Sequence, residues 1–162
     1  MSKTDCAPCL SLHEARHTVA AWRRDHQRTV FTNGCFDLLH PGHIDYLQHA
    51  RALGDALIIG LNNDASVRGL KGPLRPINPL HDRAIMLGAL GCVDLIVPFN
   101  EPTPIRVISA LLPDILVKGG DYNADDIVGA EEVRANGGEV IVMPFISGYS
   151  SSALIQRIVD VH

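Results

Sequence analysis

The sequence has no apolar run long enough to span a bilayer, and its polar start, Met-Ser-Lys-Thr-Asp-Cys, does not resemble a signal peptide. Both absences favour a cytoplasmic protein, in which the four cysteines are expected to be reduced thiols. The sequence also has no excess of basic residues. It contains 14 Lys and Arg and 18 Asp and Glu, which gives a formal net charge of −4. Nucleic acid and membranes are therefore not expected partners, and an anionic ligand must be held by locally placed donors.

Internal repeats, low-complexity segments and linkers are absent as well. A chain of 162 residues, 46% apolar and 20% charged, has the make-up of a single globular domain. Within it, we expect residues 1–27 to form a loose N-terminal tail and an amphipathic helix. Residues 28–162 are expected to form the domain that carries the function.

Short apolar segments alternate with helical ones along the chain. Strands are expected at 29–32, 56–61, 93–97, 115–117 and 140–143, and helices at 10–26, 44–53, 80–90, 104–112, 126–135 and 151–159. Few polar residues interrupt the strands, as is typical of strands buried on both faces. The sequence therefore predicts an α/β fold, a Rossmann-like doubly wound parallel sheet of about five strands with helices on both faces. Ligands of such folds bind beyond the carboxyl ends of the strands.

The first residues contain a possible metal-binding pattern. Cys6, Cys9, His13 and His17 follow a Cys-x2-Cys-x3-His-x3-His spacing. Zinc uses such side chains, but zinc fingers place about a dozen residues between the two pairs, and here there are three. The spacing leaves zinc open as an alternative, and no metal site is predicted.

The strongest pattern directly follows the first expected strand and reads Asn33-Gly34-Cys35-Phe36-Asp37-Leu38-Leu39-His40-Pro41-Gly42-His43. It contains neither a Gly-x-Gly-x-x-Gly fingerprint nor a Gly-Lys-Ser/Thr phosphate loop. His40 and His43 lie three residues apart across a helix start at Pro41, so both rings can face one spot, which Gly42 leaves open. The free N–H groups and the positive end of the helix dipole point to the same place. The pattern predicts a phosphate pocket, whereas one histidine alone would be an ordinary surface residue.

This stretch resembles the Gly-x-Phe-Asp-x-x-His-x-Gly-His signature of the cytidylyltransferase-like nucleotidyltransferases. The resemblance covers roughly residues 29–160, and its wider match is to members that convert D-glycero-β-D-manno-heptose 1-phosphate to ADP-heptose. Further segments that carry it are Asn62-Asn63-Asp64-Ala65-Ser66-Val67, Leu70-Lys71-Gly72-Pro73, Arg75-Pro76-Ile77-Asn78, Glu101 with Thr103-Pro104, Val117-Lys118-Gly119-Gly120-Asp121-Tyr122 and Gly148-Tyr149-Ser150-Ser151-Ser152.

The resemblance implies a reaction in which a sugar 1-phosphate attacks the α-phosphorus of ATP and pyrophosphate leaves, supplying ADP-heptose for lipopolysaccharide core synthesis. A phosphate with a second pKa of about 6 is largely a dianion at neutral pH, so it needs no general base. Mg²⁺ is expected to arrive with ATP, because no carboxylate cluster suggests a fixed cage, and Asp37 is expected to be structural or a helix cap. A homo-oligomer, dimer or larger, is also expected. Relatives are often fused to a sugar kinase. The transferase domain stands alone in this sequence, so a separate kinase is expected to supply the sugar 1-phosphate.

The same resemblance assigns roles to individual residues. The expected catalytic residues are His40 and His43, at the α-phosphate and the leaving oxygen, and Lys71, in a Gly/Pro-rich loop that closes over the phosphates. The expected sugar-phosphate residues are Asn62, Asp64, Arg83 and Glu101. The expected nucleotide-binding residues are Thr32, Asn33, Gly34, Cys35, Phe36, Gly42, Lys118, Gly119, Asp121, Ser150, Ser151 and Ser152.

Simpler interpretations compete with several of these roles. Arg83 is a candidate grip for the acceptor phosphate, and a surface ion pair is the alternative. Lys71 has the alternative of a solvated lysine. Asp121 would take a ribose hydroxyl, whereas a plain turn would explain only the neighbouring glycines. The three serines form a cradle for the β- and γ-phosphates or, for one of them, an N-cap.

Two other functions remain as alternatives. Glycerol-3-phosphate or ethanolamine-phosphate cytidylyltransferase is the alternative enzyme. The glycerol-phosphate enzymes carry an arginine upstream of the serine, where this chain reads Phe145-Ile146-Ser147-Gly148-Tyr149-Ser150, and this difference weighs against CTP. A non-catalytic nucleotide-binding module is the alternative of another class, and the intact pair of His40 and His43 weighs against it.

Overall fold

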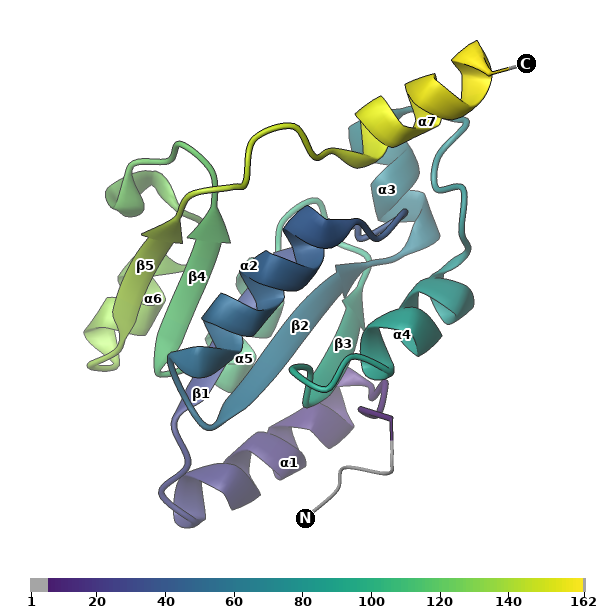
Figure 1. Cartoon of the computed structure of the whole chain (residues 1–162). Coiled ribbons are helices and arrows are strands. Elements are labelled where there is room, and N and C mark those ends of the chain that lie inside the picture. Colours follow the sequence, from purple (N-terminus) through teal and green to yellow (C-terminus); the bar gives the residue numbers. More distant parts are fainter. Residues whose placement is uncertain (1–5, 162) are drawn as a thin grey trace.

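A five-stranded parallel sheet forms the centre of the computed structural model, which describes residues 6–161 (Figure 1). The strand order is β3-β2-β1-β4-β5, so the chain reverses direction across the sheet between β1 and β4. This confirms the predicted doubly wound α/β fold and puts its switch point beside β1. The strands are β1 (Thr29–Gly34), β2 (Ala56–Asn62), β3 (Leu95–Phe99), β4 (Ile115–Gly119) and β5 (Glu139–Met143).

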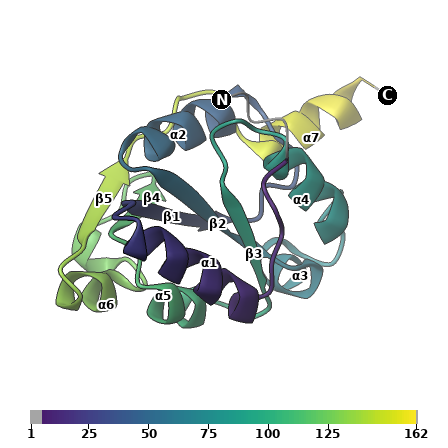
Figure 2. The same ribbon diagram turned by 90° about the horizontal axis from the view of Figure 1, so that it is seen from below.

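Helices cover both faces of the sheet (Figure 2). One face carries α1 (Leu12–Arg24), α5 (Ile105–Leu111) and α6 (Ala130–Ala135), and the other carries α2 (Pro41–Ala52) and α4 (Leu80–Gly88). Every predicted helix is present. The short elements α3 (Asp64–Lys71) and η1 (Ala124–Asp126) and the last helix, α7 (Ser151–Asp160), lie beyond the carboxyl ends of the strands.

The helix α3 replaces part of a predicted polar loop. Its amino end is capped by Asn63, whose side chain accepts a hydrogen bond from the Ser66 N–H at 2.9 Å. Ser66 and Val67 are buried. The sequence signal was weak because the helix is one of the shortest in the chain and contains a glycine.

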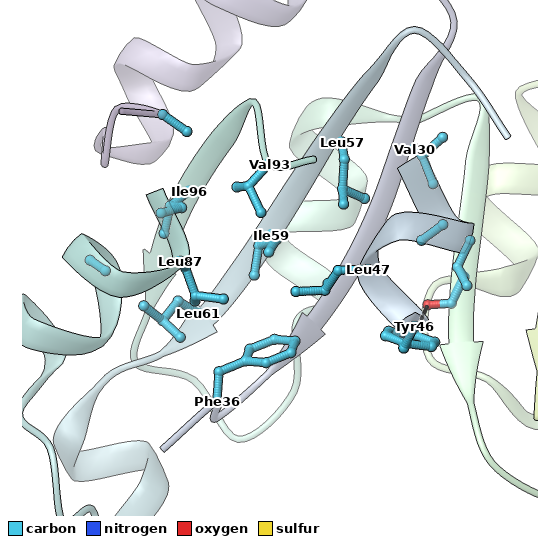
Figure 3. Close-up of a cluster of buried hydrophobic side chains, with 14 of the residues drawn as sticks. Val30, Phe36, Tyr46, Leu47, Leu57, Ile59, Leu61, Leu87, Val93 and Ile96 are labelled. Atoms are coloured by element: carbon cyan, nitrogen blue, oxygen red, sulfur yellow. Dashed lines mark hydrogen bonds between the residues drawn. The ribbon is translucent and has the colours of Figure 1, made fainter. Parts of the chain in front are cut away.

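Alternating strand residues divide the core into two clusters. Val30, Leu57 and Ile59 pack with Leu47 and Leu87 beneath α2 and α4 (Figure 3). Their strand neighbours point to the opposite face, against α1, α5 and α6. Each such fully buried side chain stabilises the fold by about 1.5–3 kcal/mol through the hydrophobic effect. The central strands are therefore held rigidly from both sides, and the loops at their carboxyl ends start from fixed points.

The expectation of a loose N-terminal tail is wrong for residues 7–10. The Ala7 N–H donates to the Gly88 carbonyl at 2.8 Å, the Leu10 N–H to the Ile96 carbonyl at 2.9 Å, and the Ile96 N–H to the Pro8 carbonyl at 2.9 Å. The segment thereby pairs with the outer edge of β3, whose backbone groups would otherwise have no partner. Residues 1–5 lie outside the described residues, and no helix of residues 6–161 is long and apolar enough to cross a bilayer.

Candidate active site

A cavity of about 580 Å³ opens over the carboxyl ends of β1, β2 and β4. Its walls come from the loop between β1 and α2, the segment after α3, the end of β4 and the segment between β5 and α7. The cavity lies beside the switch point of the sheet, where the fold predicts a ligand. Its lining comprises Asn33, Gly34, Cys35, Phe36, Asp37, His40, Gly42, His43, Tyr46, Asn62, Leu70, Lys71, Arg75, Lys118, Gly119, Tyr122, Phe145, Ile146, Tyr149, Ser150, Ser151 and Ser152.

The two histidines stack at the start of α2. Their ring centroids are 3.7 Å apart with an interplanar angle of 18°. His40 is the N-cap, and its Nδ1 accepts a hydrogen bond from the His43 N–H at 3.3 Å, so a neutral His40 carries its proton on Nε2. A Cβ at Gly42 would lie 3.0 Å from the His40 ring and 3.0 Å from the Tyr149 Cβ, so a larger residue would have to push one of them aside. Both histidines line the cavity, as the sequence predicted.

Burial keeps these imidazoles uncharged at neutral pH. It lowers the pKa of His43 to about 4, with a further contribution from the neighbouring His40. Burial also lowers the pKa of His40. The Nδ1 atom of His43 is buried and has no hydrogen-bond partner among the described residues. A neutral, incompletely paired imidazole donates one N–H to an incoming anion without first breaking an internal ion pair.

Asp37 fixes the loop that carries the histidines to the loop between α3 and α4. Its carboxylate accepts the Ile77 N–H at 2.8 Å, the Asn78 N–H at 2.8 Å and the Arg75 Nε at 2.7 Å. Burial raises the pKa of Asp37, but hydrogen bonds from Asn78, Ile77 and Arg75 outweigh it, so the pKa lies below its ordinary value. Asp37 is therefore structural, and it is not a helix cap.

Arg83 lies outside the lining of the cavity in which the sequence analysis expected it to bind the acceptor phosphate. Its side chain is 0% exposed and does not line the cavity. It donates to the carbonyls of Asn78 at 2.9 Å, Cys35 at 2.7 Å and Asn62 at 2.8 Å, and to the Asp64 carboxylate at 2.7 Å. These bonds use its Nε and both Nη atoms, so Arg83 joins three loops from inside the protein. The alternative of a surface ion pair is equally wrong.

Two more of the expected sugar-phosphate residues lie outside the cavity lining. Asp64 accepts the Leu80 N–H at 2.9 Å as well as the Arg83 guanidinium. Glu101 accepts a hydrogen bond from Arg106 at 2.8 Å, and this bond lowers its pKa. Of this group, Asn62 alone lines the cavity.

Most of the expected nucleotide-binding residues line the cavity, but Thr32 and Asp121 do not. Thr32 is fully buried, and its hydroxyl shares a hydrogen bond with the Tyr46 hydroxyl at 2.7 Å. Asp121 is exposed beyond the end of β4. The residues that the cavity does bring together are Asn33, Gly34, Cys35, Phe36, Gly42, Lys118, Gly119, Ser150, Ser151 and Ser152.

The start of α7 is tied to the loop before α2. The Ser151 hydroxyl donates to the Leu38 carbonyl at 2.9 Å. The Ser150 hydroxyl accepts the Ala153 N–H at 2.9 Å. Ser150 is therefore the N-cap of α7, the role that the sequence analysis gave to one of the three serines. The amino ends of α2 and α7 therefore meet at one cavity, and their positive dipole ends both favour an anion there.

Sequence reasoning missed an aromatic rim. Phe145 is 60% exposed, Tyr122 is 53% exposed and Tyr149 is 47% exposed, although all three line the cavity. The ring of Phe145 packs directly over Gly119, where any side chain would collide with it. The available signal was the presence of aromatic residues in polar loops that follow strands. Such rings offer flat surfaces to a nucleobase or a sugar.

The cavity is locally basic in a chain of net negative charge. Three cations line it, Lys71, Arg75 and Lys118, against one carboxylate, Asp37, which is already bonded to Arg75. Burial lowers the pKa of Lys118. Lys71 ends α3 rather than lying in a loop. The arrangement suits a ligand with several phosphate groups.

The donor set of the cavity does not fit a metal cage. No group of three or more His, Cys, Asp or Glu residues among residues 6–161 is placed to hold a metal ion. This finding includes Cys6, Cys9, His13 and His17. A divalent ion in the cavity would have to be held mainly by the oxygens of a bound ligand.

This chain is similar to known proteins over most of its length. The cytidylyltransferase-like family matches residues 31–157. The bifunctional protein HldE of Pectobacterium atrosepticum is 55% identical over 145 residues, covering 90% of this chain and 30% of that protein. The HldE protein of Azorhizobium caulinodans is 51% identical over 148 residues, covering 91% of this chain and 31% of that protein. The chain thus spans about a third of the length of these relatives.

Two solved structures share the fold. A lipopolysaccharide core biosynthesis protein from Thermoplasma volcanium has a TM-score of 0.60 and 29% identity, covering 76% of this chain and 99% of that one. Pantoate-beta-alanine ligase from Francisella tularensis has a TM-score of 0.59 at 13% identity, covering 90% of this chain and 69% of that one, which shows the fold alone. The family match contains every segment that lines the cavity, and the chain therefore belongs to the cytidylyltransferase-like family.

Proposed function

We propose that this chain is a nucleotidyltransferase that transfers AMP from ATP to D-glycero-β-D-manno-heptose 1-phosphate. The products are ADP-heptose, used for lipopolysaccharide core synthesis, and pyrophosphate. The stacked pair of His40 and His43 in a locally basic cavity carries the proposal. The heptose acceptor rests on the sequence motifs, and identities of 51% and 55% to HldE proteins support it. The similarity to a lipopolysaccharide core biosynthesis protein supports the same pathway.

The reaction exchanges one phosphorus–oxygen bond for another. An oxygen of the acceptor phosphate bonds to the α-phosphorus of ATP, and the bond from that phosphorus to the bridging oxygen breaks, so the electron pair leaves with pyrophosphate. The acceptor is already a dianion, so no side chain has to remove a proton. This fits a cavity that offers neutral imidazoles and cations and no free carboxylate.

His40 and His43 act on the charge that builds up around the α-phosphorus. Their N–H groups are already in place at the start of α2, so they need little reorganisation when the transition state forms. Partial burial strengthens each hydrogen bond relative to one in water. Lys71 and the amino ends of α2 and α7 add positive potential from other sides. Mg²⁺ comes with ATP and neutralises its phosphates, held by few or no protein ligands.

A pyrophosphate-release assay tests the proposal. ATP and CTP are each offered with heptose 1-phosphate, other sugar 1-phosphates, glycerol 3-phosphate and ethanolamine phosphate. We expect ATP with heptose 1-phosphate to give the highest kcat/KM. Faster turnover with CTP for every acceptor would replace this function with that of a cytidylyltransferase. Tight ATP binding with no pyrophosphate from any pair would identify a non-catalytic module.

Self-association is part of the proposal. No residue of α7 is buried, and two of its apolar side chains are largely exposed, Ile158 at 52% and Val159 at 61%. An exposed apolar face of this kind favours a homo-oligomer, dimer or larger. Light scattering after gel filtration gives the mass, and a monomer at micromolar concentration would contradict this part. A cytoplasmic location remains a prediction from the sequence.

A further inference from the structure

Arg75 is a cation to which the sequence gave no role, and it lies in the wall of the active-site cavity. Its side chain is 13% exposed, and its Nε donates to the Asp37 carboxylate at 2.7 Å. This is the one hydrogen bond that its guanidinium makes to a described residue. The two Nη groups therefore keep their donors for a ligand.

Asp37 holds this guanidinium in a fixed direction. The carboxylate is 1% exposed and is itself held by the backbone N–H groups of Ile77 and Asn78, each at 2.8 Å. These bonds also keep the pKa of Asp37 below its ordinary value, so the anchor stays ionised. An arginine fixed through Nε presents its Nη atoms as a rigid fork, which matches two oxygens of one phosphate.

The topology indicates which phosphate meets this fork. Arg75, Lys71 and Asn62 all come from the end of β2 or the chain that follows it. Lys118 comes from the end of β4, on the other side of β1. The chain after β5 crosses back over the sheet, where the Ser151 hydroxyl donates to the Leu38 carbonyl in the loop before α2. The histidines, which follow β1, lie between the two groups in the order of the strands. The cations of the cavity therefore lie on two sides of the histidines, Arg75 and Lys71 on one side and Lys118 on the other, so that two phosphorylated substrates can be held separately.

We propose that Arg75 binds the phosphate of the acceptor through its two Nη atoms, the role that the sequence assigned to Arg83. The inference rests on the proposed function and names the residue that selects a phosphorylated acceptor. A dianion that approaches a triphosphate meets strong repulsion, and a fixed guanidinium beside Lys71 offsets it. Arg75 also positions an acceptor oxygen for attack on the α-phosphorus beside His40 and His43.

Two substitutions at Arg75 test the inference in the pyrophosphate-release assay. We expect Arg75→Gln to raise the KM for heptose 1-phosphate by about 10- to 100-fold, because a charged bidentate contact is lost, while the Kd for ATP changes by less than about threefold. Arg75→Lys should give an intermediate KM, since it keeps the charge and loses the fork. A weaker Kd for ATP with an unchanged acceptor KM would assign Arg75 to the triphosphate and overturn the inference.

Arg51→Gln is the matched control. The Arg51 Nε donates to the Asp94 carboxylate at 2.7 Å, the same bond that joins Arg75 to Asp37, but Arg51 does not line the cavity. We expect Arg51→Gln to leave both substrate constants unchanged. If both glutamine variants change the two constants alike, Arg75 has only a structural effect and the inference fails.

Inorganic phosphate separates this inference from the proposed function. If the wild type releases no pyrophosphate with any acceptor, the proposed function fails, but phosphate binding still decides the role of Arg75. With a non-hydrolysable ATP analogue present, phosphate is titrated against the wild type and Arg75→Gln and followed by NMR. We expect the Kd for phosphate to rise at least tenfold in the variant, and an equal Kd in both proteins would overturn the inference.

Discussion

The two ends of the parallel sheet use charged side chains in opposite ways. At the amino end, the aspartates are engaged by the fold itself. Asp114 accepts the N–H of Thr29 at 2.7 Å and its hydroxyl at 2.9 Å. Asp94 accepts the Leu57 N–H at 2.8 Å and the Arg51 Nε at 2.7 Å. These carboxylates pair backbone donors at strand starts, so their negative charge is used for stability.

At the carboxyl end, the balance is reversed. Lys71 and Lys118 line the cavity and form no ion pair with a described residue, and Arg75 keeps two donor groups free. A chain with a net charge of −4 therefore presents a positive cavity at one end. Charge placement in three dimensions, rather than net charge, decides which ligand this protein attracts. The comparison predicts that changes at the amino end alter stability and that changes at the carboxyl end alter activity.

Arg83 is the exception at the carboxyl end, because its cation is wholly engaged in the structure. We expect Arg83→Ala to lower the free energy of unfolding by about 3–5 kcal/mol, the effect of breaking a buried charged network. The buried carbonyls of Cys35 and Asn62 would lose their donor. Urea unfolding measures this change. A variant of normal stability that merely bound acceptor weakly would restore the original assignment of Arg83.

The histidines should show the reverse behaviour. We expect His40→Ala and His43→Ala each to lower kcat by about 10²–10³-fold, which corresponds to about 2.7–4 kcal/mol of transition-state stabilisation, with little change in Tm. Steady-state pyrophosphate release measures this loss. His49→Ala is the control on the same helix, since its side chain is 63% exposed and outside the cavity. Undiminished turnover in both active-site variants would remove the histidines from the mechanism.

Asp114 tests the amino end of the comparison. We expect Asp114→Ala to lower the free energy of unfolding by about 1–3 kcal/mol, because the nearly buried Thr29 loses the acceptor for its N–H and its hydroxyl. The kcat and both KM values should remain those of the wild type below the new Tm. A selective loss of turnover in the fully folded variant would show that the two ends are not separate in function.

His43 also makes the stability of the fold depend on pH. Its pKa falls to about 4 in the folded protein, against about 6.5 when unfolded, so the unfolded state binds more protons between these values. Stability from this group is complete above about pH 6.5 and is lost as the pH falls towards 4. Urea unfolding at several pH values should show a flatter profile for His43→Gln than for the wild type. NMR titration of the His43 ring should give a midpoint near pH 4, and a midpoint near 6.5 would contradict this account.

The fold could be predicted because its signals are local. Runs such as Ala56–Asn62 are continuous and apolar, and each is followed by a turn and a helical pattern. The histidine pair could also be predicted, since a spacing of three residues across a helix start fixes which way both rings point. The short helix α3 and the docked segment at residues 7–10 were missed. Their stability comes from tertiary contacts, which leave little trace in local sequence.

The roles of the arginines show the limit of sequence reasoning. Arg75 and Arg83 lie eight residues apart in one polar stretch, and both have the charge to bind phosphate. The structure buries Arg83 among carbonyls, whereas the two Nη groups of Arg75 have no hydrogen-bond partner within residues 6–161. Asp37, nearly forty residues earlier in the chain, makes this distinction. No spacing rule relates residues so far apart.

The sequence by itself determined the parallel sheet, its order of strands and helices along the chain, and the paired imidazoles at the start of α2, because backbone geometry and side-chain periodicity act over a few residues. The tertiary structure alone decided which cations stay available and which are consumed inside the fold. That outcome depends on which distant carboxylates and carbonyls lie within hydrogen-bonding distance, and only the folded chain brings them together.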